Sequence, residues 1–179
     1  NLNKKKINIY AKCFSPNFND KTYNEKKLDI LINSYLKDLK KDKINIQWMW
    51  RADLDNDVNR CKYFSEKLFE IDNSMGKLKK KSVNEIYCFP YSLYFAKLAR
   101  KIKNINGLSI YFNPKELSYR KLLLNKNIGI RPLYAGKLTS KYTFKELIYF
   151  SLKEKKISKT ILSINKIKNF KYFYNFLNA

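Results

Sequence analysis

Alternating apolar and polar positions begin the chain. Over residues 6–14 every second residue is apolar, which predicts a half-buried β-strand. The spacing then changes to that of an amphipathic helix over residues 24–41, with charged residues outside the apolar stripe. This stripe consists of Leu28, Leu31, Ile32, Tyr35, Leu36 and Leu39. The chain therefore starts with a strand and a helix that can cover it.

The same two kinds of spacing recur in the rest of the N-terminal part. Three more stretches have the β-branched, aromatic or alternating composition of strands: residues 44–50, 82–90 and 108–112. Two more have the spacing of helices: residues 58–71 and 92–103. We expect an acidic loop at residues 51–57. We also expect a basic turn at residues 73–81, where the sequence NSMGKLKKK combines Gly with four lysines.

Helical spacing dominates after residue 112. A helix is expected over residues 113–124, because Asn113 suits the N-cap and Pro114 the first helical position. Residues 127–140 contain two glycines and read as a loop. Two further helices are expected at the C-terminal end: residues 143–153 and 158–177.

The order of these elements predicts a fold class. Strand, helix, strand, insert, strand, helix and strand in succession match a ferredoxin-like α+β domain with βαββαβ order. We therefore expect two domains. Residues 1–112 would form the ferredoxin-like domain, and residues 113–179 would form a basic helical C-terminal extension.

The net charge of the chain gives information about its binding partner rather than its fold. Lys and Arg number 38 against 15 Asp and Glu, which gives a net charge of +23. Abundant Lys, Asn, Ile, Tyr and Phe are typical of AT-rich codon usage, so part of the Lys excess is compositional. The shortage of acid is not explained in this way, and after residue 86 only Glu116, Glu146 and Glu154 are acidic. Such an excess indicates a polyanionic partner, and nucleic acid is the first candidate.

The basic side chains supply the candidate binding site. They cluster on the predicted turn at 73–81, on the outer side of the helix at 92–103, and around the loop at 127–140. Lys and Arg at this density suit contacts with phosphates, and Tyr134 in the loop could stack on a base. The predicted RNA-binding residues are Lys77, Lys79, Lys80, Lys81, Lys97, Arg100, Lys101, Arg120, Lys121, Arg131, Lys137, Lys141, Lys155 and Lys156.

Catalytic chemistry has little support in the sequence. His is absent, so the commonest general base is missing, and neither GxxxxGK[ST] nor GxGxxG occurs. The acidic cluster at Asp53, Asp55 and Asp57 invites a metal site. An EF-hand, however, would need Gly where Val58 stands and Glu where Phe64 stands. We therefore predict no catalytic residues, no metal site and no cofactor, and read the cluster as a solvated loop.

Three cysteines and the hydropathy pattern provide evidence on the cellular compartment of the protein. Cys13, Cys61 and Cys88 lack the short spacing of a zinc site, and we expect them to be small buried hydrophobes in a reducing environment. No apolar run approaches the roughly 20 residues that a membrane helix needs. The N-terminus is basic without the apolar stretch of a secretory signal.

Residues 5–112 resemble the small-subunit ribosomal protein S-ten family, as encoded in protist mitochondria. The segment KKINIYAKCF resembles the family's first strand, and EIYCFPYSLYFAKLARKI resembles its strand, Pro-containing turn and basic helix. The family's Ser-Pro-His turn is represented by Phe89, Pro90 and Tyr91. The resemblance implies a ferredoxin-like fold, a hairpin reaching rRNA near residues 77–81, and neighbouring ribosomal proteins as partners. Residues 51–72 would be an insert, and the extension after residue 112 has no counterpart in the family.

The sequence therefore favours a non-enzymatic structural constituent of a mitochondrial ribosome in the matrix. Its partners would be ribosomal RNA and other ribosomal proteins, with no small-molecule substrate and no membrane span. Two alternatives stay open. One is a metal-dependent nuclease or RNA-modifying enzyme that uses the cluster at residues 53–57. The other is a basic accessory subunit of a membrane complex.

Overall fold

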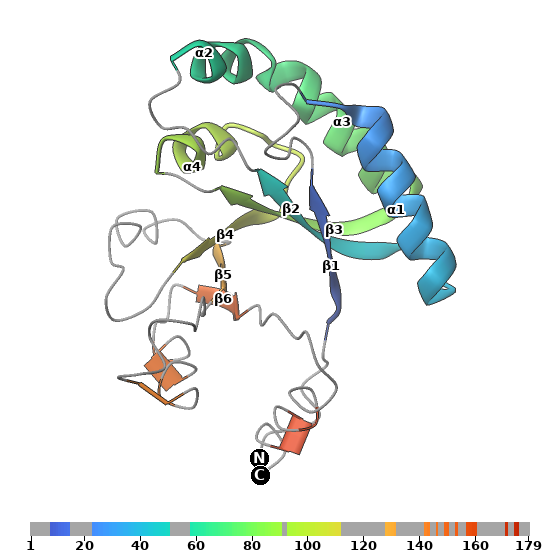
Figure 1. Ribbon diagram of the computed structural model, residues 1–179, viewed down its shortest axis with the longest axis vertical. Coiled ribbons are helices and arrows are strands. Elements are labelled where there is room, and N and C mark those ends of the chain that lie inside the picture. The colour runs from blue at the N-terminus through green and yellow to red at the C-terminus, as the bar shows by residue number, and fades with distance from the viewer. Residues whose placement is uncertain are drawn as a thin grey trace.

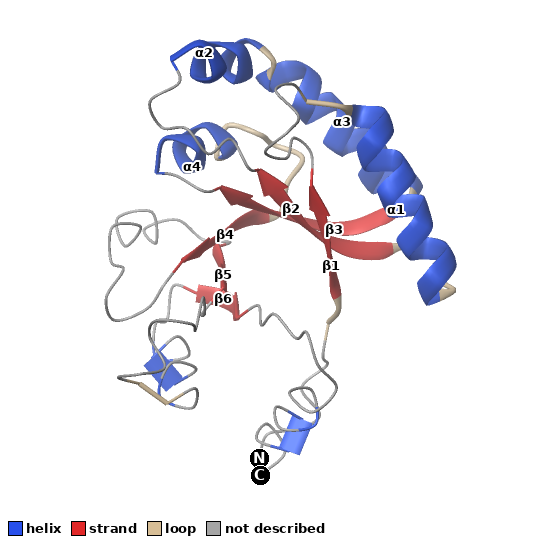
Figure 2. Cartoon of the chain, viewed as in Figure 1, coloured by secondary structure: helices blue, strands red, loops and turns tan. Residues whose placement is uncertain are grey.

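The chain folds as a run of strands and helices in alternation. The computed structural model describes residues 8–14, 23–50, 58–90, 93–111, 128–131, 142–143, 146, 149–150, 153, 157–160, 171 and 174–175. Within these residues lie β1 (Tyr10–Phe14), α1 (Glu25–Leu39), β2 (Ile44–Trp50), α2 (Val58–Glu66), α3 (Leu68–Lys81), β3 (Val83–Pro90), α4 (Leu93–Ala99), β4 (Gly107–Tyr111), β5 (Ile128–Arg131) and β6 (Ile157–Thr160). Figure 2 shows these helices and strands along the chain.

All strands of the described part belong to one parallel sheet. Its order is β1-β2-β3-β4-β5-β6, so each strand pairs with the next strand along the chain. Each of the five pairings is parallel. A helix lies between β1 and β2, two lie between β2 and β3, and one lies between β3 and β4. Figure 1 shows α1 to α4 on one side of a curved sheet. This is the winding of a TIM barrel, in which strands close into a cylinder inside a ring of helices.

The prediction of a ferredoxin-like α+β domain with a helical extension was wrong. A ferredoxin-like sheet is antiparallel, and it requires a hairpin between the second and third strands. The basic turn expected at residues 73–81 instead forms the second half of α3. The helical connection returns the chain to the end of the sheet at which β2 starts. Strand β3 therefore runs parallel to β2.

The C-terminal part departs from the prediction as well. Ile128–Arg131, placed in a loop, is β5, and Ile157–Thr160 is β6, where a helix was expected from residue 158. Both strands continue the sheet that β1 begins. The helix expected at 113–124 lies outside the described residues. The division of the chain into domains at residue 112 stays a prediction.

The main core lies between the sheet and the helices. Alternate strand residues face the helices and are buried, among them Cys13, Ile46, Trp48, Cys88 and Ile110. The helices contribute the other half of this core: Leu28, Ile32, Phe64, Ile71, Met75, Leu78, Phe95, Ala96, Leu98 and Ala99. Burial of a side chain of this size stabilises by about 1.5–3 kcal/mol, so this layer determines which face of each strand packs against the helices.

Local signals set the ends of the first helix. The side chain of Asn24 accepts a hydrogen bond from the Lys27 backbone N–H at 2.9 Å, as an N-cap does. At the other end Lys40 adopts the left-handed conformation (φ 51°), and its N–H bonds back to the last turn. The helix predicted at residues 24–41 is thus confirmed to within two residues at each end. No helix within the described residues is long and apolar enough to cross a membrane.

Candidate functional site

The face of the sheet turned away from the helices is rich in polar side chains. Residues paired in register point to the same face of a parallel sheet, and Lys12 pairs with Gln47, which pairs with Tyr87. Because the alternate residues face the helical core, this row lies on the opposite, interior face. The polar side chains at interior positions of β1 to β4 include Tyr10, Lys12, Asn45, Gln47, Glu85, Tyr87 and Ser109.

Strands β1 and β3 contact one another across this face. The Tyr10 hydroxyl donates a hydrogen bond to the Glu85 carboxylate. The Tyr10 ring meets the Tyr87 ring edge-on, with ring centroids 5.7 Å apart. Both contacts pass over β2, which separates the two strands in the sheet. Tyr87 is buried, whereas Tyr10 and Glu85 are half-buried. The sheet is therefore curved enough for side chains of β1 and β3 to form one cluster.

Strands β2 and β4 meet in the same manner. Gln47 Nε2 donates a hydrogen bond to Ser109 Oγ at 2.7 Å, and both side chains are almost fully buried, at 1% and 0% exposed. Thus β1 contacts β3, and β2 contacts β4. Interior layers drawn from alternate strands are the packing of a TIM barrel. In such barrels these layers consist mainly of Val, Ile and Leu, so polar side chains here are unusual.

The carboxyl ends of the strands lie on one edge of the sheet. Because every pairing is parallel, the last residues of the strands mark this edge: Phe14, Trp50, Pro90, Tyr111, Arg131 and Thr160. Tyr111 and Arg131 are register partners there. Active sites of TIM barrels form at this edge, from strand ends and the loops that follow them. Met49 and Phe89, paired in register, are buried on the interior face just before it.

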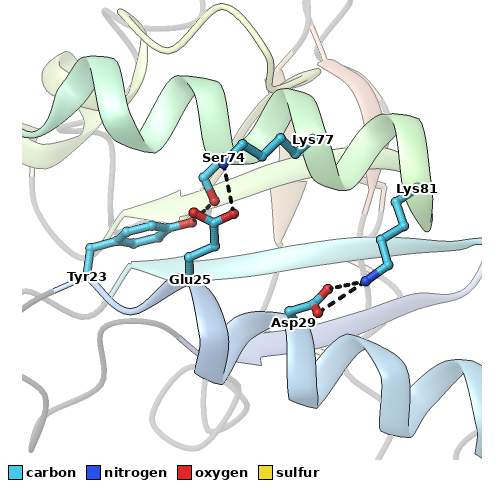
Figure 3. A network of polar contacts seen from close by, with 6 residues as sticks. All are labelled: Tyr23, Glu25, Asp29, Ser74, Lys77 and Lys81. Carbon is cyan, nitrogen blue, oxygen red and sulfur yellow. Dashed lines mark hydrogen bonds and ion pairs between the residues drawn. The ribbon is translucent and has the colours of Figure 1, made fainter.

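Two of the predicted RNA-binding lysines instead make ion pairs between helices. Figure 3 shows α1 and α3 side by side, with ion pairs between their side chains. Lys77 Nζ lies 3.5 Å from Glu25 Oε1, and Lys81 Nζ lies 3.2 Å from Asp29 Oδ2. These side chains are exposed or partly so, and such pairs are worth little individually. The ion pairs nevertheless direct the ammonium groups of Lys77 and Lys81 toward carboxylates of the same chain.

The remaining predicted RNA-binding residues lie on several elements, and their role stays a prediction. Lys79 and Lys80 lie on α3, while Lys97 lies on α4 and Arg100 and Lys101 follow that helix. Arg131 is the last residue of β5. The other predicted residues lie outside the described residues: Arg120, Lys121, Lys137, Lys141, Lys155 and Lys156.

Cys13 and Cys88 are buried in the core, as expected for small hydrophobic residues. Cys13 and Cys88 are free, fully buried thiols on the helix-facing side. Burial raises the pKa of Cys13 to about 12 and raises that of Cys88 well above its ordinary value. Thiols in this state are poor nucleophiles. The acidic cluster at residues 53–57 and the side chain of Cys61 lie outside the described residues. No group that could hold a metal ion occurs among the side chains described.

The interior residues were not found from the sequence, although a signal for some of them was present. Gln47 is the one non-aromatic polar residue inside the apolar run IQWMW, and Ser109 interrupts GLSIY. A buried polar residue within an apolar strand points to a partner on that face. Lys12 carried no such signal, because an alternating strand looks the same whether its second face meets water or a barrel interior.

Comparison with known proteins supports the barrel-type fold. No family model matches the sequence, and no curated protein does. Two solved structures are similar in fold: aldo-keto reductase AKR11C1 from Bacillus halodurans in its apo and holo forms. The holo form gives a TM-score of 0.59 at 13% identity, covering 99% of this chain and 69% of that chain. The apo form gives 0.52 at 13% identity over 87% of this chain, which spans only 63% of the reductase.

These likenesses overturn the functional interpretation drawn from charge. The solved structures that share the fold are reductases, not ribosomal proteins, so the resemblance to the S-ten family was wrong. The expectations of a non-enzymatic role, of ribosomal RNA and ribosomal proteins as partners, and of no small-molecule substrate fall with it. Neither the nuclease nor the membrane-subunit alternative gains support. Mitochondrial localisation stays a prediction. The chain shares the α/β-barrel type of fold found in aldo-keto reductases.

Proposed function

We propose that this chain is an oxidoreductase that reduces the carbonyl group of a small molecule at the interior, carboxyl-end side of its parallel sheet. The fold alone does not specify an activity, since barrels of this type carry many chemistries. The observation that carries the proposal is the polar interior of the sheet, where Lys12, Gln47, Glu85, Tyr87 and Ser109 occupy positions that barrels usually fill with branched apolar residues.

The energetic cost of this interior argues for function. Burying a polar group that lacks a full set of hydrogen bonds costs about 1–3 kcal/mol, and apolar residues at the same positions would avoid that cost. Proteins depart from the stability optimum mainly where chemistry or binding requires it. The reductases that share the fold supply the class of chemistry for the proposal.

Reduction of a carbonyl needs a hydride at carbon and a proton at oxygen. Tyr87 is the candidate proton donor, because its phenol lies on the interior face of β3. The Tyr10 ring lies beside it, but the Tyr10 hydroxyl donates to Glu85. Lys12 lies on the same register row as Tyr87, and a cation there favours the developing oxyanion.

The hydride requires a donor, and a nicotinamide nucleotide supplies one in reactions of this class when it is bound. Its phosphates are anionic, which suits a chain of net charge +23. Arg131 ends β5 at the carboxyl end of the sheet, where such a nucleotide would bind. The sequence has no GxGxxG loop, so this binding would not use a Rossmann-type turn.

The proposal is tested on the purified full chain by following oxidation of NADPH or NADH in the presence of small aldehydes and ketones. Tyr87→Phe should lower kcat by roughly 100-fold or more, since loss of a general acid typically costs that much. Tyr63→Phe is the matched control, because Tyr63 lies on α2 and packs edge-on against Phe64 in the helical layer. Absence of carbonyl-dependent oxidation, or equal rates for wild type and Tyr87→Phe, would contradict the proposal.

A further inference from the structure

Gln47 carries an unsatisfied hydrogen-bond acceptor in the interior of the sheet. Its side chain is 1% exposed, and its Nε2 donates to Ser109 Oγ at 2.7 Å. Its Oε1 has no hydrogen-bond partner in the part of the chain that the structure describes. Buried polar atoms are nearly always paired, so a lone buried carbonyl needs an explanation. A bound ligand group is one that fits its position on the interior face.

The hydrogen-bond donors and acceptors that Gln47 and Ser109 leave unused define the chemical group that could bind to them. Ser109 Oγ accepts one hydrogen bond from Gln47 and still has its own O–H to donate. Gln47 Oε1 remains to accept. The second N–H of Gln47 Nε2 is a further donor, so the pair presents both donors and an acceptor side by side. If the amide were rotated by 180°, Ser109 would donate to it, and the pair would again present both donors and an acceptor.

A neutral hydroxyl matches this arrangement better than other common groups do. A hydroxyl both donates and accepts, so one such group can bond to both side chains. A carboxylate or phosphate would meet the carbonyl oxygen of Gln47 and be repelled, and an ammonium would leave the Ser109 hydroxyl without an acceptor. A purely apolar group would leave Gln47 unsatisfied, at the same cost as before.

We propose that Gln47 and Ser109 form a subsite that binds a hydroxyl group of a small ligand in the sheet interior. Gln47 lies on the register row that carries Lys12 and Tyr87, and Ser109 lies two residues after Gly107, the β4 residue of that row. If the chain is the oxidoreductase proposed above, on which this second step rests, its substrate is a hydroxylated aldehyde or ketone. The carbonyl would then lie near Tyr87, and the hydroxyl would lie against Gln47 and Ser109.

The first experiment compares two substrates that differ in hydroxyl groups, glyceraldehyde and propanal. The wild-type chain should have the higher kcat/KM for glyceraldehyde. Gln47→Met and Ser109→Ala should each reduce the glyceraldehyde-to-propanal ratio of kcat/KM by roughly tenfold to 100-fold, the effect of losing one buried hydrogen bond to substrate. An unchanged ratio in both variants overturns the subsite.

Ser82→Ala is the matched control for these variants. Ser82 Oγ is the other buried side-chain oxygen without a partner among the described residues, and it lies between α3 and β3 rather than on the interior row. Its removal should leave the ratio unchanged. Gln47→Met removes an unsatisfied carbonyl but also the hydrogen-bond partner of Ser109 Oγ, so its two effects on Tm oppose one another. Ser109→Ala provides the second test should Gln47→Met fail to fold.

A binding measurement separates this inference from the proposed activity. Saturation-transfer NMR with glycerol as the probe requires no turnover. Glycerol should receive magnetisation from the wild type and from Ser82→Ala, and much less from Gln47→Met and Ser109→Ala. If the chain reduces no carbonyl and glycerol still binds through Gln47, the subsite stands and the proposed oxidoreductase function fails. Equal transfer in all four proteins overturns the subsite, whatever the activity.

Discussion

A single glycine on α3 lies against a rigid neighbour. A Cβ at Gly76 would lie 3.2 Å from Asn104 Nδ2 and 3.3 Å from its Cγ. Asn104 cannot move easily, because its backbone N–H and side-chain Nδ2 both donate to Asp72 Oδ1, at 2.7 and 3.0 Å. Nδ2 also donates to the Asp72 carbonyl at 3.0 Å. Gly76 therefore permits the turn after α4 to contact α3 closely.

This contact makes the effect of Gly76→Ala depend on Asn104. Alanine favours a helix over glycine by about 1 kcal/mol, but the clash should outweigh this gain and lower the free energy of unfolding by roughly 1 kcal/mol. In an Asn104→Ala background the clash disappears, and Gly76→Ala should then stabilise. Urea unfolding of the four proteins measures both effects. Stabilisation by Gly76→Ala in the wild-type background would show that the Asn104 side chain moves to make room for the added methyl group.

At the scale of elements, the contact between α1 and α3 depends on one partly buried hydrogen bond. Tyr23, just before α1, has its hydroxyl 2.7 Å from Ser74 Oγ on α3, as Figure 3 shows. Ser74 is 1% exposed, and the Tyr23 ring packs edge-on against Trp48 of β2. This bond, rather than the exposed lysine pairs beside it, should hold the two helices in place.

A double-mutant cycle tests this ranking. Ser74→Ala should destabilise by roughly 1–3 kcal/mol, because it leaves the buried Tyr23 hydroxyl without a partner. Tyr23→Phe should cost a similar amount, and the double variant should cost less than the sum. The corresponding cycle on Lys81 and Asp29 should give a coupling below about 1 kcal/mol. A larger coupling for the exposed pair would reverse the ranking.

Several elements could be read from the sequence because local pattern determines them. The strand INIQWMW occupies Ile44–Trp50 as predicted, and Asn24 caps the helix that was expected to start there. The second half of α3 was missed, since Gly76 and three consecutive lysines suggested a turn. Its buried residues Ile71, Met75 and Leu78 nonetheless have helical spacing. Gly76 is tolerated because of its tertiary contact with Asn104, which no local pattern reveals.

At the scale of the whole molecule, the wrong prediction of a turn at residues 73–81 led to the wrong prediction of the fold. Strand direction depends on whether a connection is a hairpin or a helix, so reading residues 73–81 as a turn made the sheet antiparallel. The same error hid the candidate site. In an antiparallel sheet Lys12 and Gln47 would face solvent on an open surface, whereas in a curved parallel sheet they face the interior.

The buried protonated groups make the stability of the whole molecule sensitive to alkali. Burial raises the pKa of Cys13 and of Tyr23 to about 12, from ordinary values of 9.0 and 10.0. The unfolded chain therefore releases these protons at lower pH than the folded chain does. The stability that they contribute is fully present below about pH 9 and is lost as the pH rises toward 12.

The free energy of unfolding should thus decline above about pH 9, each group adding up to about 1.4 kcal/mol per pH unit. Cys13→Ala should make the decline shallower while removing little volume from the core. Urea titrations from pH 7 to 11 measure the slopes, and only the difference in slope bears on Cys13. Parallel curves for the two proteins would mean that the thiol does not ionise differently on folding.

The order of strands in the sheet has a consequence for how the chain folds. Because each described strand pairs with the next described strand along the chain, each of these pairings closes only the segment between two consecutive strands. The entropy lost in each step stays small, and contact order is low for a sheet protein. Folding can therefore advance unit by unit from β1, α1 and β2, each finished unit offering the next strand an edge to join. A chain of this topology can begin to assemble while its C-terminal half is still being synthesised.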